Sequence, residues 1–248
     1  MAKEKDEERA KALEEGEADD LPLMHGIPFS IKDLLNQKGK LSTVGCAYLC
    51  DDRAKDDSAI VKIYMKHGAI PIVRGNCPQS ALSMHTDNLI FGESKNPHRI
   101  ERSCGGSSGG DAGLVAARCV PFAIGTDIGG SMRFPAAFCG IYGFKPTTNR
   151  MTRRGSAPAR KNRFSAFNHI YSVVGPMGSS VDDCIIGMRV QCDTDIHLYD
   201  PLTTPSPFRE EEFNLVQDEP EKIKIGVLRE SNFLQCSKAV KRAMQEAE

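Results

Sequence analysis

Short apolar runs bounded by glycine or polar residues recur along this chain and predict buried strands. Such runs lie at residues 26–32, 69–74, 120–125, 172–177 and 222–228. Apolar side chains at helical spacing predict helices at residues 58–67, 113–119, 181–189 and 237–247. This alternation predicts an α/β fold, in which Ser58 and Ser180 are placed to cap two of the helices.

The remaining segments show little apolar periodicity. Residues 2–20 are charged helix formers with Leu13 as the sole large apolar side chain, which predicts a solvent-exposed helix. Residues 149–168 are polar and predict a long loop, and the proline-punctuated residues 201–207 predict a linker. We therefore expect a charged N-terminal helix within residues 1–20 and one domain over residues 21–248.

Composition narrows the class of protein. The 248 residues suffice for a sizeable core, and the net charge of -1 gives no indication of a nucleic-acid partner. No stretch reaches the roughly 18 uninterrupted apolar residues of a membrane span, because Arg118 and Pro121 interrupt residues 112–124. The first twenty residues also lack the apolar stretch of a signal peptide. We expect a protein of the cytoplasm or of the periphery of an intracellular membrane.

Cysteine usage points to a reducing compartment. The nine cysteines form no C-x-x-C pair and have no histidine at metal-ligand spacing. We expect reduced thiols that pack as small buried hydrophobic groups, and no metal site.

Two glycine-serine clusters carry the candidate chemistry. The first, residues 105–110, contains Ser107 and Ser108, and the second ends in Ser131. A serine nucleophile needs backbone N–H groups to hold a developing oxyanion, and glycine leaves such groups uncovered. We predict Ser131 as the nucleophile. The predicted oxyanion donors are the backbone N–H groups of Ile128, Gly129, Gly130 and Ser131.

Lys32 is the candidate base. It ends the predicted strand at residues 26–32, whose apolar side chains favour burial of the amine. Burial lowers the pKa of a lysine, and a neutral amine can accept a proton through Ser107 or Ser108. Each candidate also has an ordinary structural alternative. Lys32 would be a surface lysine paired with Asp33, residues 105–110 would be a flexible Gly-Ser linker, and Ser131 would cap the segment that follows its glycine turn.

The first cluster also matches the nucleophile elbow of Ser-His-Asp hydrolases, with His169 or His197 as the base. An elbow needs a strand directly before it, and the polar residues 96–103 predict a loop instead. Asp127 and Arg133 flank Ser131, and we expect them to pair and brace its loop. Since no phosphate-binding glycine motif and no helical carboxylate–imidazole pair occurs, the sequence indicates no cofactor and no metal.

Three motifs resemble the amidase signature family in order and spacing. They are residues 26–33, 105–110 and 125–136. Further segments resemble the fatty-acid amide hydrolase branch of that family, at residues 76–80, 138–147 and 205–212. The resemblance extends from about Leu21 onward and implies a mixed, twisted β-sheet covered by helices on both faces.

The resemblance also implies roles for individual residues. Lys32 would be the base, Ser107, in a cis peptide, the proton relay, and Ser131 the acylated nucleophile. Ser108 would support the site, as would Asp127 and Arg133. Ala81 aligns with a substrate-contacting position that holds a bulkier side chain in fatty-acid amide hydrolase.

Family members are about twice as long, so we expect this chain to be the amino-terminal portion of such a domain. The resemblance implies that the other half of such a domain completes the sheet and much of the acyl channel and, in the fatty-acid amide hydrolase branch, a membrane-binding cap.

Three functions stay open. The first is hydrolysis of a small carboxamide, expected to be lipophilic because apolar residues suggest a greasy entrance, although they equally suit a core; these are Leu82, Met84, Ile90 and Phe91. The second is glutamine hydrolysis by an amidotransferase A-type subunit with a protein partner, and the third is an inactive fragment. We also keep open peripheral contact with a membrane and a homodimer.

Overall fold

The computed structural model describes residues 1–157, 170–229 and 235–248. It divides into two units, Met1–Phe208 and Arg209–Glu248. The separate N-terminal helix and single domain predicted from the sequence stay predictions.

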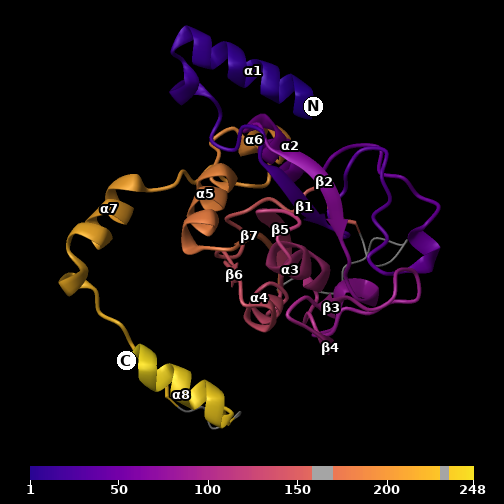
Figure 1. The fold of residues 1–248 in the computed structure, drawn as a ribbon, viewed down its shortest axis with the longest axis vertical. Helices are drawn as coiled ribbons and strands as arrows, with labels where there is room; N and C mark the ends of the chain where they lie inside the picture. The colour runs from indigo at the N-terminus through magenta and orange to yellow at the C-terminus, as the bar shows by residue number, and fades with distance from the viewer. Residues whose placement is uncertain (158–169, 230–234) are drawn as a thin grey trace. The chain divides into compact units, whose positions relative to one another are not determined.

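A mixed five-stranded sheet forms the centre of the first unit (Figure 1). Its strand order is β2-β1-β5-β7-β6. Strand β1 runs parallel to both β2 and β5, whereas β7 runs antiparallel to β5 and β6. The strands are β1 (Pro28–Lys32), β2 (Ile70–Gly75), β5 (Phe122–Asp127), β6 (Tyr142–Gly143) and β7 (Val173–Gly178). The four strands predicted before residue 178 are confirmed to within three residues at each end.

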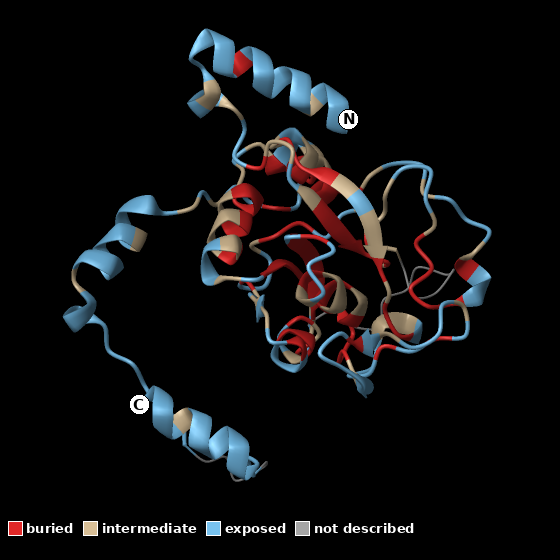
Figure 2. Cartoon of the chain, viewed as in Figure 1, coloured by how far each residue is buried: buried red, intermediate tan, exposed pale blue. Residues whose placement is uncertain are grey.

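Helices cover both faces of this sheet, as the resemblance implied. One apolar cluster packs α2 and α5 against Phe29 and Phe122, and the other packs α3 and α4 against Ala123 and Met177. The α-helices of the first unit are α1 (Ala2–Glu15), α2 (Ala59–Lys66), α3 (Gly109–Ala116), α4 (Arg133–Cys139), α5 (Val181–Gln191) and α6 (Ile196–Tyr199). Figure 2 shows the buried residues gathered on the sheet and on the elements beside it, while α1 is almost entirely exposed.

Tyr64 is the central side chain of the first cluster. Its ring lies 5.4 Å from the Phe29 ring and 5.4 Å from the Phe122 ring. Its buried hydroxyl donates to the Gly187 carbonyl at 3.2 Å and accepts from the Gln191 side-chain amide at 3.0 Å. Tyr64 therefore joins α2 to α5 through both apolar packing and hydrogen bonds.

Two helix predictions needed correction. Helix α3 begins at Gly109, four residues earlier than predicted. The sequence pattern did not indicate its first turn, because that turn contains glycines and an aspartate, which have low helix propensity. Ser180 caps α5 in a capping box, as expected, and Ser58 occupies the N-cap position of α2. The Ser58 hydroxyl is buried and has no hydrogen-bond partner among the described residues, so the predicted side-chain cap is absent there.

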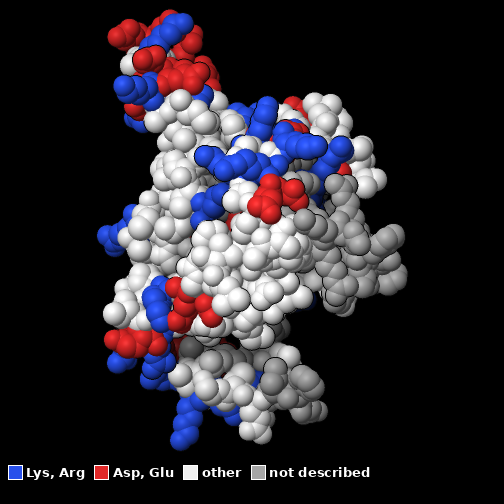
Figure 3. Space-filling view, turned by 90° about the vertical axis from the view of Figure 1, so that its right-hand side faces the viewer, with Lys and Arg blue, Asp and Glu red and all other residues white. Residues whose placement is uncertain are grey.

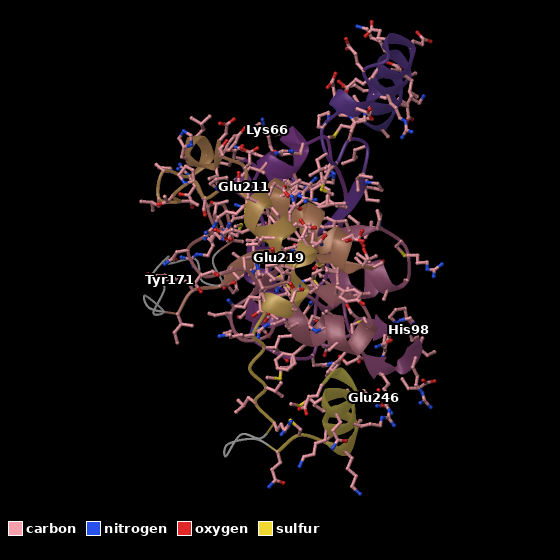
Figure 4. All side chains as sticks on the ribbon, turned by 90° about the vertical axis from the view of Figure 1, so that its left-hand side faces the viewer. Lys66, His98, Tyr171, Glu211, Glu219 and Glu246 are labelled. Carbon is pink, nitrogen blue, oxygen red and sulfur yellow. The ribbon has the colours of Figure 1, made fainter. Side chains whose placement is uncertain are left out.

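The loop predicted at residues 96–103 is a hairpin instead. Strands β3 (Lys95–Asn96) and β4 (Arg99–Ser103) pair antiparallel. Tertiary contacts hold this polar segment: the Asn96 side chain donates to the Phe138 carbonyl at 2.8 Å, and the His98 ring lies 2.9 Å from the Cys139 carbonyl (Figure 4). Anchoring by α4 compensates for the missing apolar alternation, which is why the sequence pattern did not indicate strands.

The long loop predicted at residues 149–168 is described as far as residue 157. Residues 149–157 contain no helix or strand, apart from an isolated bridge between Ser156 and Leu35. The rest of the predicted loop lies outside the described residues. The predicted linker at residues 201–207 also forms neither helix nor strand. No helix in the described part of the chain is long and apolar enough to cross a membrane.

The second unit contains α7 (Glu210–Asp218), a short 3-10 turn at Pro220–Lys222 and α8 (Lys238–Ala247). The Ser237 hydroxyl caps α8, which agrees with the helix predicted there. The strand predicted at residues 222–228 was wrong, since Ile225 is 82% exposed and Leu228 78% exposed outside any strand. A strand requires a partner for its N–H and C=O groups, and the described residues of this unit supply none.

All nine cysteines are free in this structure. Six are buried, but Cys119 and Cys236 are exposed and Cys50 is half-buried, so the expectation of uniform burial was wrong for these three. Cys119 follows the end of α3, where the chain passes over the surface.

Replacing Tyr64 with phenylalanine tests the link between α2 and α5. Tyr64→Phe keeps the ring but leaves the Gln191 amide without its acceptor, so we expect a loss of about 1 kcal/mol in the free energy of unfolding. Urea denaturation followed by circular dichroism measures it. The matched control is Tyr142→Phe at an exposed site, and an equal effect of both variants would contradict the assignment.

Candidate active site

Three parallel strands end at one edge of the sheet and place the candidate residues there. Strand β1 ends at Lys32, β2 ends at Gly75, and β5 ends at Asp127. Lys32 pairs in register with Gly75. The two glycine-serine clusters follow at this edge, one leading into α3 and the other joining β5 to α4. Ligand sites of α/β sheets gather at such carboxyl ends, as the sequence predicted for these motifs.

Lys32 is fully buried and contacts Ser107. Its Nζ donates to the Ser107 Oγ at 2.7 Å and to the Thr126 Oγ1 at 2.9 Å. The alternative of a surface lysine paired with Asp33 was wrong. The Asp33 carboxylate instead accepts from Arg74 at 3.1 Å and from the backbone N–H of Thr43 at 3.1 Å, which fixes the corner after β1.

Burial lowers the pKa of Lys32 to about 8, while the nearby carboxylates of Asp111 and Asp127 act to raise it. Desolvation dominates because the ammonium form has lost its water. At pH 7 about a tenth of the amine is therefore neutral, and at pH 8 about half. A buried amine with this pKa can exchange protons at physiological pH, which an ordinary lysine does not do.

The structure distinguishes the two serines of the first cluster. Ser107 follows a cis peptide bond and is the one whose hydroxyl contacts Lys32. The Ser108 hydroxyl lies 3.3 Å from both the N and the O of Thr126, and its N–H donates to the Ser131 carbonyl at 3.0 Å. Ser108 therefore joins the two clusters, and Ser107 is the serine placed for proton exchange with the amine.

Two glycines of this cluster permit close approach of a neighbouring segment. A Cβ at Gly106 would lie 2.6 Å from the Ser83 carbonyl oxygen, and one at Gly109 would lie 2.3 Å from the Thr86 Oγ1. Thr86 is buried and donates to the Gly105 carbonyl at 2.8 Å. The segment of residues 83–86 thus packs directly against the loop that carries Ser107.

Asp127 organises the loop that carries Ser131. Its buried carboxylate accepts from the Gly130 N–H at 2.7 Å and the Met132 N–H at 3.2 Å, and it pairs with Arg133 at 3.0 Å. Burial acts to raise the pKa of Asp127, but Arg133 and these N–H groups hold it below the ordinary value. The predicted Asp127–Arg133 pair is confirmed.

The same contacts correct the predicted set of oxyanion donors. The Gly130 N–H donates to Asp127 and is not free. The N–H groups of Ile128, Gly129 and Ser131 have no hydrogen-bond partner among the described residues. The half-buried Ser131 hydroxyl likewise makes no hydrogen bond within the described chain, so its predicted link to Ser107 is not formed in this structure.

The nucleophile-elbow alternative requires a histidine that hydrogen-bonds to a serine of the two clusters, and the described residues contain none that does so. Its requirement for a preceding strand is met, since β4 ends at Ser103, contrary to our expectation. His197 contacts the Thr194 carbonyl at 2.9 Å, and His169 lies outside the described residues. No imidazole in the described ranges hydrogen-bonds to Ser107, Ser108 or Ser131.

The apolar residues expected at an entrance lie on the segment beside Ser107. Leu82 is 68% exposed and Met84 is 61% exposed, and Phe91 is also exposed, so the core alternative was wrong for these three. Ile90 is half-buried. Ala81 is half-buried and packs against a small cluster around Val44.

Sequence reasoning missed two residues next to Lys32. Thr126 holds the amine through its hydroxyl, and Asp111 is a fully buried carboxyl in the first turn of α3. A polar residue within an otherwise apolar strand was the available signal for Thr126. Asp111 gave none, because an acidic residue in the first turn of a helix is common.

Two cavities lie away from these residues. One, of about 740 Å³, is lined by Ser103, Phe138 and residues of the β3–β4 hairpin. The other, of about 700 Å³, is lined by basic and acidic side chains that include Arg53, Asp56 and Lys62. Figure 3 shows a face that is mostly uncharged, with lysine and arginine side chains gathered in a band across its upper part and a smaller acidic patch beside them.

Comparison with known proteins decides the family. The family model described as Amidase matches residues 1–248. The chain belongs to the Amidase family. The mixed sheet with helices on both faces is accordingly the amidase signature fold.

Individual relatives extend this result. The chain is 36% identical over 224 residues to "Fatty-acid amide hydrolase 1" of Sus scrofa, covering 90% of this chain and 37% of the relative. It is 39% identical over 186 residues to the A-type subunit of glutamyl-tRNA(Gln) amidotransferase from Treponema pallidum (strain Nichols), covering 75% and 35%. A solved structure titled "Fatty acid amide hydrolase" matches with a TM-score of 0.81 at 27% identity, covering 99% of this chain and 42% of that one. The chain thus spans less than half the length of these Amidase relatives.

Removing the Asp127 charge tests the organisation of the Ser131 loop. Asp127→Asn weakens the acceptors for Gly130 and Met132, so we expect a loss of about 1–3 kcal/mol in the free energy of unfolding and faster amide hydrogen exchange at residues 128–133. Denaturation and exchange mass spectrometry measure these effects. Asp52→Asn, at an exposed carboxylate, is the control. Unchanged exchange in this loop would refute the role of Asp127.

Proposed function

We propose that this chain carries the catalytic residues of a serine-dependent amide hydrolase, with Lys32 as base, Ser107 as relay and Ser131 as nucleophile. The observation that carries the proposal is the 2.7 Å contact between the buried Lys32 amine and the Ser107 hydroxyl. A lysine with a lowered pKa beside a serine hydroxyl is the arrangement that general-base activation requires. Membership of the Amidase family supports the same reaction.

Acylation follows from these positions. Neutral Lys32 takes the proton of the Ser107 hydroxyl while Ser107 takes the proton of Ser131, whose Oγ bonds to the amide carbon. The N–H groups of Ile128, Gly129 and Ser131 face the negative carbonyl oxygen in this proposal. Substrate binding must bring the Ser131 hydroxyl within hydrogen-bond distance of Ser107, a contact that forms only in the complex in many enzymes.

Collapse of the tetrahedral intermediate breaks the carbon–nitrogen bond. The proton on Lys32 returns through Ser107 to the departing amine, which leaves the acyl group as an ester on Ser131. Water then attacks this ester with the same base and restores the Ser131 hydroxyl. The products are a carboxylic acid and an amine or ammonia.

We infer a lipophilic amide, of the fatty-acid amide class, as the substrate. The segment at residues 82–91 presents Leu82, Met84 and Phe91 to solvent, and its residues 83–86 pack against the Ser107 loop. An exposed apolar surface at this position fits an acyl chain. Likeness to "Fatty-acid amide hydrolase 1" of Sus scrofa supports this class.

The alternative substrate is glutamine, which the likeness to the Treponema amidotransferase supports. Recognition of glutamine requires polar groups that bind its charged ammonium and carboxylate. Apolar side chains at the entrance disfavour such a charged substrate. The third alternative, an inactive fragment, predicts that the folded chain has no reactive serine.

Two further sequence predictions are kept as proposals. The exposed apolar side chains of residues 82–91 support peripheral contact with an intracellular membrane. A homodimer remains a prediction.

Reaction with a fluorophosphonate tests the proposed nucleophile. We expect labelling of Ser131 alone, mapped by mass spectrometry, and its loss in Ser131→Ala and Lys32→Ala. The labelling rate should rise as the pH rises through about 8, because neutral Lys32, the active base, forms above its pKa. Rates measured from pH 6 to pH 10 give this profile.

The controls are Ser94→Ala and Lys95→Ala, which remove a serine and a lysine outside the site and should leave labelling intact. Absence of labelling in a chain that melts cooperatively would refute the enzyme and favour the inactive alternative.

A series of primary amides tests the substrate class. Each additional buried methylene group contributes about 0.8 kcal/mol, so kcat/KM should rise about fourfold per methylene over the first carbons of the acyl chain. Release of ammonia measures turnover, with glutamine assayed in parallel. Faster turnover of glutamine than of a long-chain amide would exclude the lipophilic class.

A further inference from the structure

A buried carboxyl lies next to the strand that carries Lys32. Asp111 is completely inaccessible to solvent in the first turn of α3. Its Oδ1 accepts from the hydroxyl of Ser30, at 2.7 Å, and Ser30 lies two residues before Lys32 on β1. A Cβ placed on Gly75 would fall 2.2 Å from the same oxygen, so the carboxyl occupies space that the glycine leaves open. Gly75 is the residue that pairs with Lys32 across the sheet.

Structural needs alone do not account for an acid at this position. The Asp111 Oδ2 has no hydrogen-bond partner among the described residues, which is costly for a buried carboxyl. No lysine or arginine forms a salt bridge with it within the described ranges. An uncharged side chain of similar volume would fill the same space without this cost.

The other groups around Lys32 already have partners or are neutral. Asp127, at the end of β5, pairs with Arg133, and Asp33, after β1, pairs with Arg74 at the end of β2. Burial raises the pKa of the Cys77 thiol to about 12, so it carries no charge at neutral pH. Among these carboxyl groups of the described chain, Asp111 is the one that forms no salt bridge with an arginine.

We propose that Asp111 is a positioning residue of the reaction, a buried counter-charge that stabilises Lys32 when the amine takes up the proton of the nucleophile. Protonation of a lysine away from water is costly unless an opposite charge lies near. Burial raises the pKa of Asp111 to about 7, and the Ser30 hydroxyl and the charges of Lys32 and Arg74 act against this rise. Its carboxylate therefore exists in the same pH range in which Lys32 exchanges protons.

This inference rests on the proposed function, since it assigns Lys32 as the base. Its prediction for Lys32 can be measured without a substrate: removing the Asp111 carboxyl lowers the pKa of the amine. The two statements can therefore fail separately.

The experiment measures the titration of Lys32 in the full chain by NMR of side-chain ¹³C,¹⁵N-labelled lysine, with Lys32→Ala to assign the signal. In Asp111→Asn we expect the midpoint, about 8 in the natural chain, to fall by about one pH unit. The pH profile of fluorophosphonate labelling should move by the same amount, and its plateau at high pH should fall roughly threefold because the base is weaker. Asp111→Glu, which keeps the charge, should restore the midpoint.

Asp200→Asn is the matched control, because Asp200 is also buried in the first unit but accepts from Thr152 and Thr203. It should leave the Lys32 midpoint unchanged. If Asp111→Asn does not fold, Ser30→Ala replaces it: loss of the hydroxyl keeps Asp111 neutral to higher pH and should move the midpoint in the same direction by less. An unchanged midpoint in the folded variant would overturn the role of Asp111, whereas a moved midpoint in a chain whose Ser131 is never labelled would leave this coupling standing and refute the proposed function.

Discussion

Burial of the Lys32 amine is the constraint on which the rest of the site depends. The amine has no access to water, so its polar contacts must come from the chain, and Ser107 and Thr126 supply them. These two residues come from different parts of the sequence, on a loop before α3 and on strand β5. The sheet must therefore bring β1 and β5 together before Lys32 can be accommodated, which couples the formation of the site to the formation of the core.

The acidic residues around the Lys32 amine have different charged partners. Asp127 is committed to Arg133 and to the backbone of the Ser131 loop, and Asp33 is committed to Arg74. Each pair fixes one corner of the sheet edge without neutralising Lys32. The amine contacts two hydroxyl groups, and Asp111, on α3, is the buried carboxyl in this region of the described chain that has no arginine partner. Its protonation is then governed by desolvation more than by direct ion pairing.

Close packing explains the many glycines at this edge. Gly106 and Gly109 let residues 83–86 lie against the Ser107 loop, and Gly75 leaves room for the Asp111 carboxyl. Any side chain at these positions would collide with backbone or polar atoms. The same packing places exposed apolar residues, Leu82 and Met84, beside the candidate relay serine. The packing of residues 83–86 on the Ser107 loop therefore explains both the need for glycine in that loop and the apolar surface beside it.

The α/β class, four strands of the sheet, the family, and the lysine and serines at the carboxyl edge could all be predicted from the sequence. Local apolar patterns and motif spacing are sufficient for these. Tertiary structure decided the rest: that Ser107 and not Ser108 contacts Lys32, that the Gly130 N–H belongs to Asp127, and that residues 96–103 form a hairpin. It also left residues 222–228 without a strand partner, despite their strand-like pattern. Those outcomes depend on which distant groups meet, and no local pattern records the partner of a hydroxyl, an amide or a strand edge.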